Sequence, residues 1–218
     1  MAISKTISCA GTDLHIFDED IGVCVSGGLD SAILLYYLMK HTKSTIHIYS
    51  QGFNAKRRRN TIIAPQVVEK CIQLTGNINI VQHIDYKDVG TLRSIAEAPI
   101  VALKQNLIKR LVIGVTMNPP DDVANSFAPE LDFDSRRKTT GDNELFVNSD
   151  TIYYPWANID KRDIAKMYKE EDLMNSLFPV TRSCEYDPTC DYFDNIEDPN
   201  LGHCGECWWC KEREWGFK

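Results

Sequence analysis

The stretch IGVCVSGGLDSAILLYYLM, residues 21–39, decides the fold of this chain. An apolar run at 21–25 enters the turn S-G-G-L-D-S at 26–31, and apolar residues at helical spacing leave it. The glycines let the backbone reach positive φ and come close to an anion, while the following helix aims free N–H groups and its positive end at the same place. The stretch therefore predicts a strand, a phosphate-binding turn and a helix.

The flanking sequence repeats this strand-helix alternation. We expect further strands at 45–49, 78–84, 111–115 and 151–156, and helices at 61–74, 99–110 and 164–174, the last one capped by Asn158 or Asp160. Alternation of this kind predicts an α/β fold with a doubly wound parallel sheet. The polar stretch at 116–144 is long for a plain loop and indicates a functional lid or a partly disordered segment. We expect a nucleotide-binding domain at 1–175 and a small metal-binding region at 176–218.

The turn differs from the common phosphate-binding motifs. It lacks the Lys of G-x-x-x-x-G-K-[ST], and no G-x-G-x-x-G is present. Ser26 and Ser31 add hydroxyl donors. Asp30 fits beside phosphate when Mg²⁺ lies between them, because hard cations take carboxylate oxygen. The candidate catalytic residues are therefore Asp30 and Ser31, and the candidate phosphate-binding residues are Ser26, Gly27, Gly28, Leu29, Asp30 and Ser31.

S-G-G-x-D-S resembles the loop of the PP-loop ATP pyrophosphatases at all five fixed positions. The resemblance implies an adenine nucleotide alpha hydrolase (HUP-like) fold that cleaves ATP between its α and β phosphates, giving an adenylated substrate and pyrophosphate. It also implies that adenine binds near the end of the second strand, where Tyr49 and Gln51 lie. Gly114, in the fourth strand, is a further candidate for nucleotide binding. The alternatives are a glycine turn without a ligand and an ordinary exit from the strand.

Five of the eight cysteines lie between positions 184 and 210. In a chain without a recognisable signal peptide, such clustering favours metal binding over disulfides. The spacing C-x2-C-x2-C lets neighbouring thiolates converge on one tetrahedral Zn²⁺. An iron–sulfur cluster is the rival, but the x3-C-P continuation typical of bacterial ferredoxins is replaced by Glu214 and Trp215. The candidate ligands are Cys204, Cys207 and Cys210, and the fourth is either Cys184 or Cys190, with His203 as a third choice.

Ser183-Cys184 followed by C-G-x-C-x-x-C at 204–210 resembles the tail of the 7-cyano-7-deazaguanine synthase (QueC) family. That resemblance implies zinc bound by Cys184, Cys204, Cys207 and Cys210. It also implies adenylation of 7-carboxy-7-deazaguanine, which ammonia then converts to the amide and, after a second activation, to the nitrile. The segment that frames the base in the family is replaced here by 116–122, where Asp121 or Asp122 is either a buried acceptor for the base or an exposed loop residue.

The altered substrate segment leaves other activities open. One is conjugation of the activated deazaguanine to the amino terminus of a partner protein, as in QueC-like proteins of CBASS-type anti-phage systems. A second is tRNA sulfur insertion, and a third is a zinc-bearing interaction module with an inactive nucleotide pocket. Lys56–Arg59 and Arg93 are candidates for positive charge near the phosphates.

Composition limits the possible partners. The net charge of -7 argues against a large nucleic-acid surface, and no segment approaches 18 consecutive apolar residues. We expect a cytoplasmic enzyme without membrane contact, acting on a small molecule with ammonia or a protein amine as acceptor, and we leave open whether it is a monomer or a homodimer.

Overall fold

The structure, a computed structural model, describes residues 3–51, 60–85, 97–127, 137, 147–184, 203 and 205–218. The elements in chain order are β1 (Ile3–Cys9), β2 (Thr12–Phe17), β3 (Ile21–Cys24), α1 (Leu29–His41), β4 (Ile46–Gln51), α2 (Asn60–Thr75), β5 (Ile80–Asp85), α3 (Glu97–Lys104), β6 (Arg110–Val112), α4 (Asp121–Phe127), β7 (Ile152–Tyr153), α5 (Lys161–Glu170), the 3-10 turn η2 (Phe178–Val180) and α6 (Trp208–Phe217).

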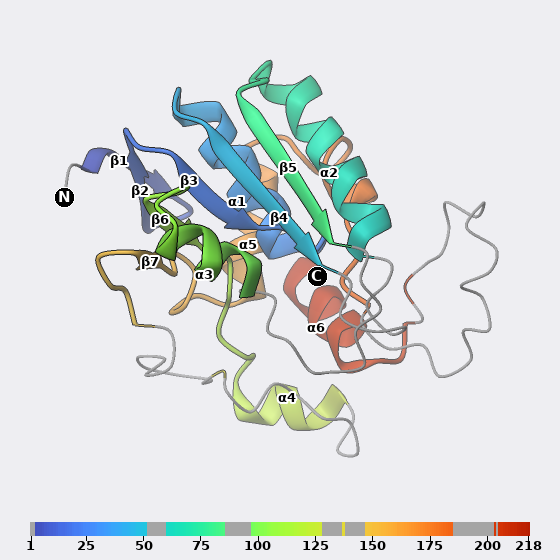
Figure 1. Cartoon of the computed structure of the whole chain (residues 1–218). Coiled ribbons are helices and arrows are strands. Elements are labelled where there is room, and N and C mark those ends of the chain that lie inside the picture. Colours follow the sequence, from blue (N-terminus) through green and yellow to red (C-terminus); the bar gives the residue numbers. More distant parts are fainter. Residues whose placement is uncertain are drawn as a thin grey trace.

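The central sheet is parallel throughout, with the strand order β5-β4-β3-β6-β7 (Figure 1). The chain builds outward from β3 through β4 to β5, then crosses back and adds β6 and β7 on the other side of β3. The predicted doubly wound α/β fold is therefore confirmed. Its connections change direction between β3 and β6, and that crevice is where ligands of such sheets bind.

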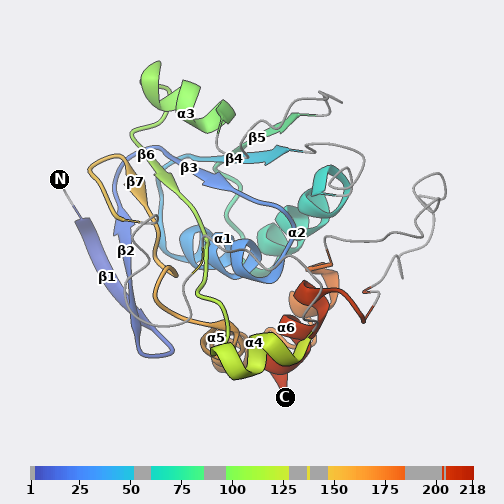
Figure 2. The ribbon, with the colours of Figure 1, turned by 90° about the horizontal axis from the view of Figure 1, so that it is seen from below.

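Helices cover both faces of the sheet. Figure 2 shows α1 and α2 on one face and α3 on the other. Every residue of β3 is buried, as expected of a strand in the middle of a covered sheet. The helix α1 is buried on nearly all sides, from Ser31 to Met39, because it lies in the main core together with residues of the sheet, α2 and α5. The glycine loop is thus anchored at both of its ends in the core.

Most predicted elements appear, with shifted ends. The helices α3 and α5 end at Lys104 and Glu170, earlier than expected. Asn106 and Asp172 follow them with positive φ angles of 58° and 54°, and a residue in that conformation terminates a helix. Of the two proposed caps, Asp160 is the one used, because its side chain accepts from Arg162 N–H at 2.7 Å.

Some of the described elements were not expected from the sequence, among them the hairpin β1–β2 and the helices α4 and α6. The hairpin β1–β2 turns at Ala10 and Gly11, which both have positive φ, as two-residue hairpin turns require. The short α4 lies within the polar stretch, and α6 carries two of the clustered cysteines, one as its N-cap and one in its first turn. Among the described residues, no helix is long and apolar enough to cross a membrane.

Candidate active site and metal centre

The glycine loop, residues 26–31, leaves β3 after Val25 at the crevice between β3 and β6. Gly27 has a φ of +82°, and a Cβ atom there would lie 2.7 Å from Cγ2 of Ile63 on α2. Both the left-handed backbone and this close approach exclude a side chain. The loop therefore occupies the ligand position of an open parallel sheet.

The hydroxyl groups of two serines hold the loop. Ser31 Oγ accepts from Ser26 N–H at 3.3 Å and donates to Gly28 O at 3.2 Å, and Gly28 N–H donates to Ser26 Oγ at 3.3 Å. The helix α1 begins directly afterwards, and its N-cap, Gly28, makes no side-chain cap hydrogen bond. The first turn of this 13-residue helix can therefore offer N–H groups and its positive end to an anion.

Asp30 lies in the first turn of α1 and forms an ion pair with Lys161, the first residue of α5. This ion pair engages Asp30 Oδ2. Oδ1 is also buried and has no hydrogen-bond partner among the described residues. A buried carboxylate oxygen without a donor is costly unless a cation binds it. The residue thus fits the predicted role of a Mg²⁺ ligand.

Lys161 is buried and was not foreseen as a site residue. Its Nζ lies 3.4 Å from Thr116 Oγ1 and 3.9 Å from Glu212 Oε2. Glu212, which is 1% exposed, forms a second ion pair with Arg137, and Arg137 Nε donates to Thr116 O at 2.7 Å. These contacts tie α5, α6 and the segment after β6 together behind the glycine loop, in a network where cations and carboxylates alternate.

A cavity of about 80 Å³ opens on the glycine loop. Such a volume accommodates the phosphate end of a nucleotide rather than a whole nucleotide. Besides the loop, its wall contains Asn60 of α2, Lys161 of α5, the segment 182–184, and Trp209 and Glu212 of α6. The cysteine-rich region therefore forms part of the wall of the same cavity.

Three buried cysteines from two distant segments meet at this wall. The Sγ atoms of Cys184, Cys207 and Cys210 all lie within 4.8 Å of one another, and those of Cys184 and Cys207 are 3.8 Å apart. Two sulfurs that each bind a tetrahedral zinc at about 2.3 Å are about 3.8 Å apart. The three thiols fit three corners of a zinc site.

Without a cation, the thiols of Cys207 and Cys210 resist ionisation. The hydrogen bond with Cys184 raises the pKa of Cys207 to about 11, and the same partner raises the pKa of Cys210. Nδ1 of His203 lies 3.8 Å from Cys210 Sγ. Burial lowers the pKa of His203 to about 4, so the imidazole is neutral at pH 7, the form that binds metals. Cys204 and Cys190 lie outside the described residues, as do Lys56–Arg59 and Arg93.

The three residues predicted to bind the nucleotide outside the loop, Tyr49, Gln51 and Gly114, differ from one another in their surroundings. Tyr49 is buried in a small cluster with Ala102 and Ile108 under α3, and its ring stacks on His83. Its side chain therefore packs on the sheet. Gln51 is the half-exposed last residue of β4. A Cβ atom at Gly114 would lie 3.1 Å from Asp30 O, so the absence of a side chain lets the chain after β6 approach the loop.

The predicted substrate contacts are only partly brought together. Asp121 and Asp122 are exposed in the first turn of α4, so the interpretation of either residue as a buried acceptor for the base is wrong. Phe178 packs against Phe217 at 4.5 Å between ring centroids, and Trp208 is buried. Of Phe178, Trp208 and Trp209, Trp209 is the one that lines the cavity on the glycine loop.

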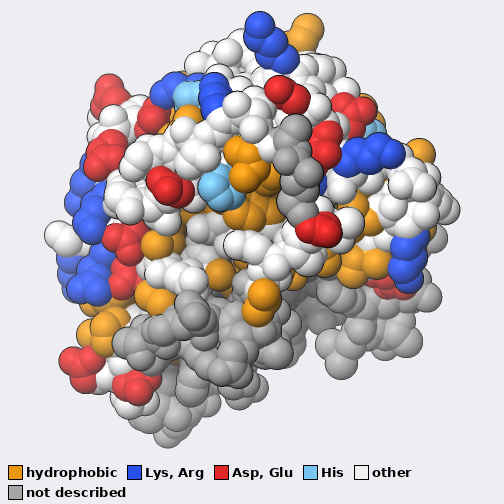
Figure 3. Space-filling view, turned by 90° about the vertical axis from the view of Figure 1, so that its left-hand side faces the viewer, with side chains coloured by type: hydrophobic (Ala, Val, Ile, Leu, Met, Phe, Trp, Pro, Cys, Tyr) orange, Lys and Arg blue, Asp and Glu red, His pale blue; other side chains and the backbone are white. Residues whose placement is uncertain are grey.

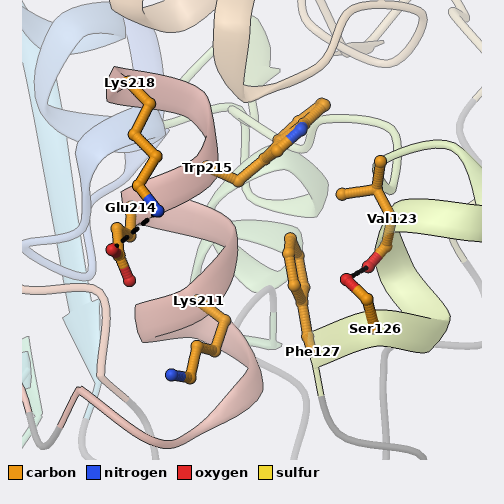
Figure 4. A pocket seen from close by; sticks show the side chains of 7 residues that line it. All are labelled: Val123, Ser126, Phe127, Lys211, Glu214, Trp215 and Lys218. Atoms are coloured by element: carbon orange, nitrogen blue, oxygen red, sulfur yellow. Dashed lines mark hydrogen bonds and ion pairs between the residues drawn. The ribbon is translucent and has the colours of Figure 1, made fainter.

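A second and larger cavity, of about 430 Å³, lies on the outer side of α6 (Figure 4). Phe127 of α4 and Trp215 of α6 project into the space between the two helices, with Lys211 and the Glu214–Lys218 ion pair along α6. This groove contains no residue of the glycine loop. We therefore assign the nucleotide chemistry to the smaller cavity.

The described part of the face drawn in Figure 3 is mixed in charge. On the face shown in Figure 3, acidic and basic side chains of the described residues alternate without forming a broad basic field. This distribution agrees with the net charge of -7. A large phosphate-backbone footprint needs clustered Lys and Arg.

Comparison with known proteins finds a match for the segment that contains the glycine loop. No curated protein sequence matches the chain significantly. Among solved structures, the chain is similar to "U34-tRNA thiolase NcsA from Methanococcus maripaludis with its 4Fe-4S cluster", with a TM-score of 0.44 and 16% identity over 91% of this chain and 71% of that chain. Residues 12–78, less than a third of the chain, match the family described as asparagine synthase. The segment that contains the glycine loop is therefore similar to a family of the ATP pyrophosphatase type.

Proposed function

We propose that this chain activates a carboxylic acid by adenylation with ATP, releasing pyrophosphate. One observation carries the proposal: the S-G-G-L-D-S loop lies at the crevice of the parallel sheet, with the Asp30–Lys161 ion pair at its cavity. The similarity of residues 12–78 to asparagine synthase supports the same chemistry.

In this reaction a carboxylate oxygen attacks the α-phosphorus of ATP. A new P–O bond to the acid forms while the bond to the bridging oxygen of pyrophosphate breaks, and the electron pair leaves with pyrophosphate. The loop amides and the positive end of α1 bind the departing anion, and Lys161 adds a buried positive charge beside it. Catalysis of such a step consists mainly of positioning and charge neutralisation.

Asp30 is the residue that would hold Mg²⁺, through the buried Oδ1, which accepts from no donor in the described part of the chain. Bound there, Mg²⁺ supplies neutralisation of the phosphate charge. Ser26 and Ser31 offer hydroxyl groups from the same loop. No covalent protein nucleophile is needed.

The cysteine cluster is proposed to bind one structural Zn²⁺. Three sulfurs within 4.8 Å of one another suit a single ion, because each thiolate of a four-iron cluster binds a different iron atom and the sulfurs then lie farther apart. The fourth ligand is proposed to be Cys204, following the resemblance of the C-G-x-C-x-x-C tail. His203, at 3.8 Å from Cys210, is the alternative within the described residues.

The proposed acid is 7-carboxy-7-deazaguanine, with ammonia as the acceptor that leads to the amide and then the nitrile. The support is the combination of two sequence signatures around one cavity, because both the glycine loop and Cys184 line it. The exposed Asp121 and Asp122 leave the recognition of the base to other residues, of which Trp209 is an available aromatic surface.

The test is a product analysis by mass spectrometry. The full chain is incubated with ATP, Mg²⁺ and 7-carboxy-7-deazaguanine, with and without ammonia. AMP, pyrophosphate and an ammonia-dependent nitrile are expected. ADP and phosphate would exclude the adenylation itself. AMP formation without any response to the acid would leave adenylation standing and remove the deazaguanine. Transfer of the acyl group to a protein amino terminus, without formation of the nitrile, would show that the acceptor is a protein amine and not ammonia.

A further inference from the structure

The segment 178–184, here called the strap, links the two halves of the candidate site. It begins with η2 and ends at Cys184. In its middle, Arg182 N–H donates to the carbonyl oxygen of Gly27 at 2.9 Å. A Cβ atom at Gly28 would lie 3.5 Å from Arg182 O, so the strap runs in contact with the glycine loop.

The upstream part of the strap is held by α6. Arg213 NH1 donates to Thr181 Oγ1 at 2.9 Å, and NH2 donates to Phe178 O at 3.1 Å. The guanidinium group also lies 4.1 Å from the centre of the Phe178 ring. Arg213 is buried and Thr181 is completely so. These contacts fix the strap before it reaches the loop.

The downstream end of the strap is attached to the same helix. Cys184 meets Cys207, the N-cap of α6, and Cys210 in its first turn. One residue, Ser183, separates Cys184 from Arg182, whose amide contacts Gly27. Since all three thiols are buried and their Sγ atoms lie within 4.8 Å of one another, a metal ion is what would hold this end in place.

We propose that the backbone N–H of Arg182 is a positioning group for the glycine loop, and that metal binding by the three cysteines sets its position. The inference rests on the proposed function, because the loop is taken as the site of the ATP phosphates. The carbonyl of Gly27 needs a fixed donor, since the left-handed backbone at Gly27 is the feature that shapes the anion site. The metal centre thereby supports the loop as well as the tail.

Hydrogen exchange measured by mass spectrometry tests this coupling without any assay of activity. The metal-loaded chain is compared with the chelated chain and with the chelated chain after zinc is returned. Removal of the metal should speed exchange across residues 21–31 about tenfold or more, and zinc should restore it. The hairpin β1–β2 serves as the reference that stays protected. Equal exchange in the loop with and without metal, while residues 205–218 respond, would overturn the proposal.

A pair of variants tests the hydrogen bond in the metal-loaded protein. Arg182→Pro removes the N–H, and Arg182→Ala keeps it while losing the same guanidinium group. Thr181 has φ -87° and ψ 149°, the extended conformation that a residue before proline adopts. Relative to Arg182→Ala, Arg182→Pro should speed exchange in the loop and weaken ATP binding about fivefold, the effect of one ordinary hydrogen bond. Equal behaviour of the two variants would refute the positioning role.

The outcomes separate this inference from the proposed function. If the loop responds to metal and to Arg182→Pro but the chain binds no ATP, the coupling stands and the proposed function fails. If the chain forms AMP and pyrophosphate while its loop ignores both changes, the function stands and the coupling fails.

Discussion

The glycine loop and the cysteine cluster border one cavity, yet the chain builds them in opposite ways. The loop consists of six consecutive residues, and its serine hydrogen bonds join residues at most five positions apart. The cluster joins Cys184 to Cys207, 23 positions later, and forms only when α6 and the strap meet. Local geometry shapes the loop, whereas tertiary packing assembles the cluster.

This difference separates chemistry from stability. The serine hydrogen bonds of the loop stay within it, and Gly27 O also accepts from Arg182 N–H of the strap, so substitutions of the loop side chains should affect the reaction more than the fold. A cluster built from distant segments holds those segments together, so substitutions there should affect the fold first. The buried ion-pair network of Lys161, Glu212 and Arg137 lies between the two regions and belongs to both.

The largest expected effect is on the reaction. Asp30→Asn keeps the shape of the side chain and removes the charge that pairs with Lys161 and would hold the metal. AMP formation should fall at least about 100-fold, as when a preorganised electrostatic contact is lost. The matched control is Asp121→Asn, an exposed carboxylate in the first turn of α4, which should retain near-full activity. An equal loss in both variants would break the contrast between loop and surface.

The next effect is on stability and comes from the network between the two regions. Glu212→Gln removes a counter-charge that is 1% exposed and leaves the buried Arg137 without its ion pair. The free energy of unfolding should fall by about 3–5 kcal/mol, measured by denaturant titration. Glu214→Gln, on the exposed side of the same helix, should show no measurable change. A similar result for the two variants would mean that the buried network contributes nothing.

The metal centre should give a somewhat smaller loss. Cys207→Ser should reduce the metal content from one ion per chain to none. It should also remove about 2.7 kcal/mol of stability when free zinc is a hundred times its dissociation constant. Cys71→Ser is the control, because Cys71 is also buried but lies in the main core, away from the cluster. Metal analysis that finds iron with inorganic sulfide, or zinc retained by Cys207→Ser, would contradict the assignment.

The same contrast explains how much of the site was predictable. The loop, its place after β3 and the parallel sheet follow from residues adjacent in sequence. Lys161 lies 131 positions from Asp30, and only its place after the cap Asp160 distinguishes it in the sequence. Glu212 is one of several charged residues in W-W-C-K-E-R-E, and only packing against Arg137 reveals that it is buried.

Charge alone also misled the sequence interpretation. Asp121 and Asp122 follow β6, as ligand-binding residues of such sheets follow their strands, but they are exposed at the start of the short helix α4. The hairpin β1–β2 was missed because its turn contains Ala10, a residue that rarely adopts positive φ. In both places the tertiary context decides, and no local pattern reports it.

The smallest expected effect is a pH dependence that lies outside both regions. On β4 and β5, His47 Nδ1 lies 3.1 Å from His83 Nε2, and the ring of His83 stacks on Tyr49. His83 is exposed, but the partial desolvation of its ring, followed by the nearby His47, lowers its pKa below the ordinary value of 6.5. Below pH 6.5 the unfolded chain therefore binds more protons than the folded chain. This contribution to stability is complete above pH 6.5 and is lost as the pH falls. Burial also lowers the pKa of His41, which adds to the same dependence of stability on pH.

Denaturant titrations from pH 7.5 to 5 should show the unfolding midpoint falling as the pH falls. The fall should be less steep in His83→Gln and less steep again in His83→Gln with His41→Gln. If neither substitution changes the slope, the groups that cause the pH dependence are not these histidines and should be sought in the loop or the cysteine cluster.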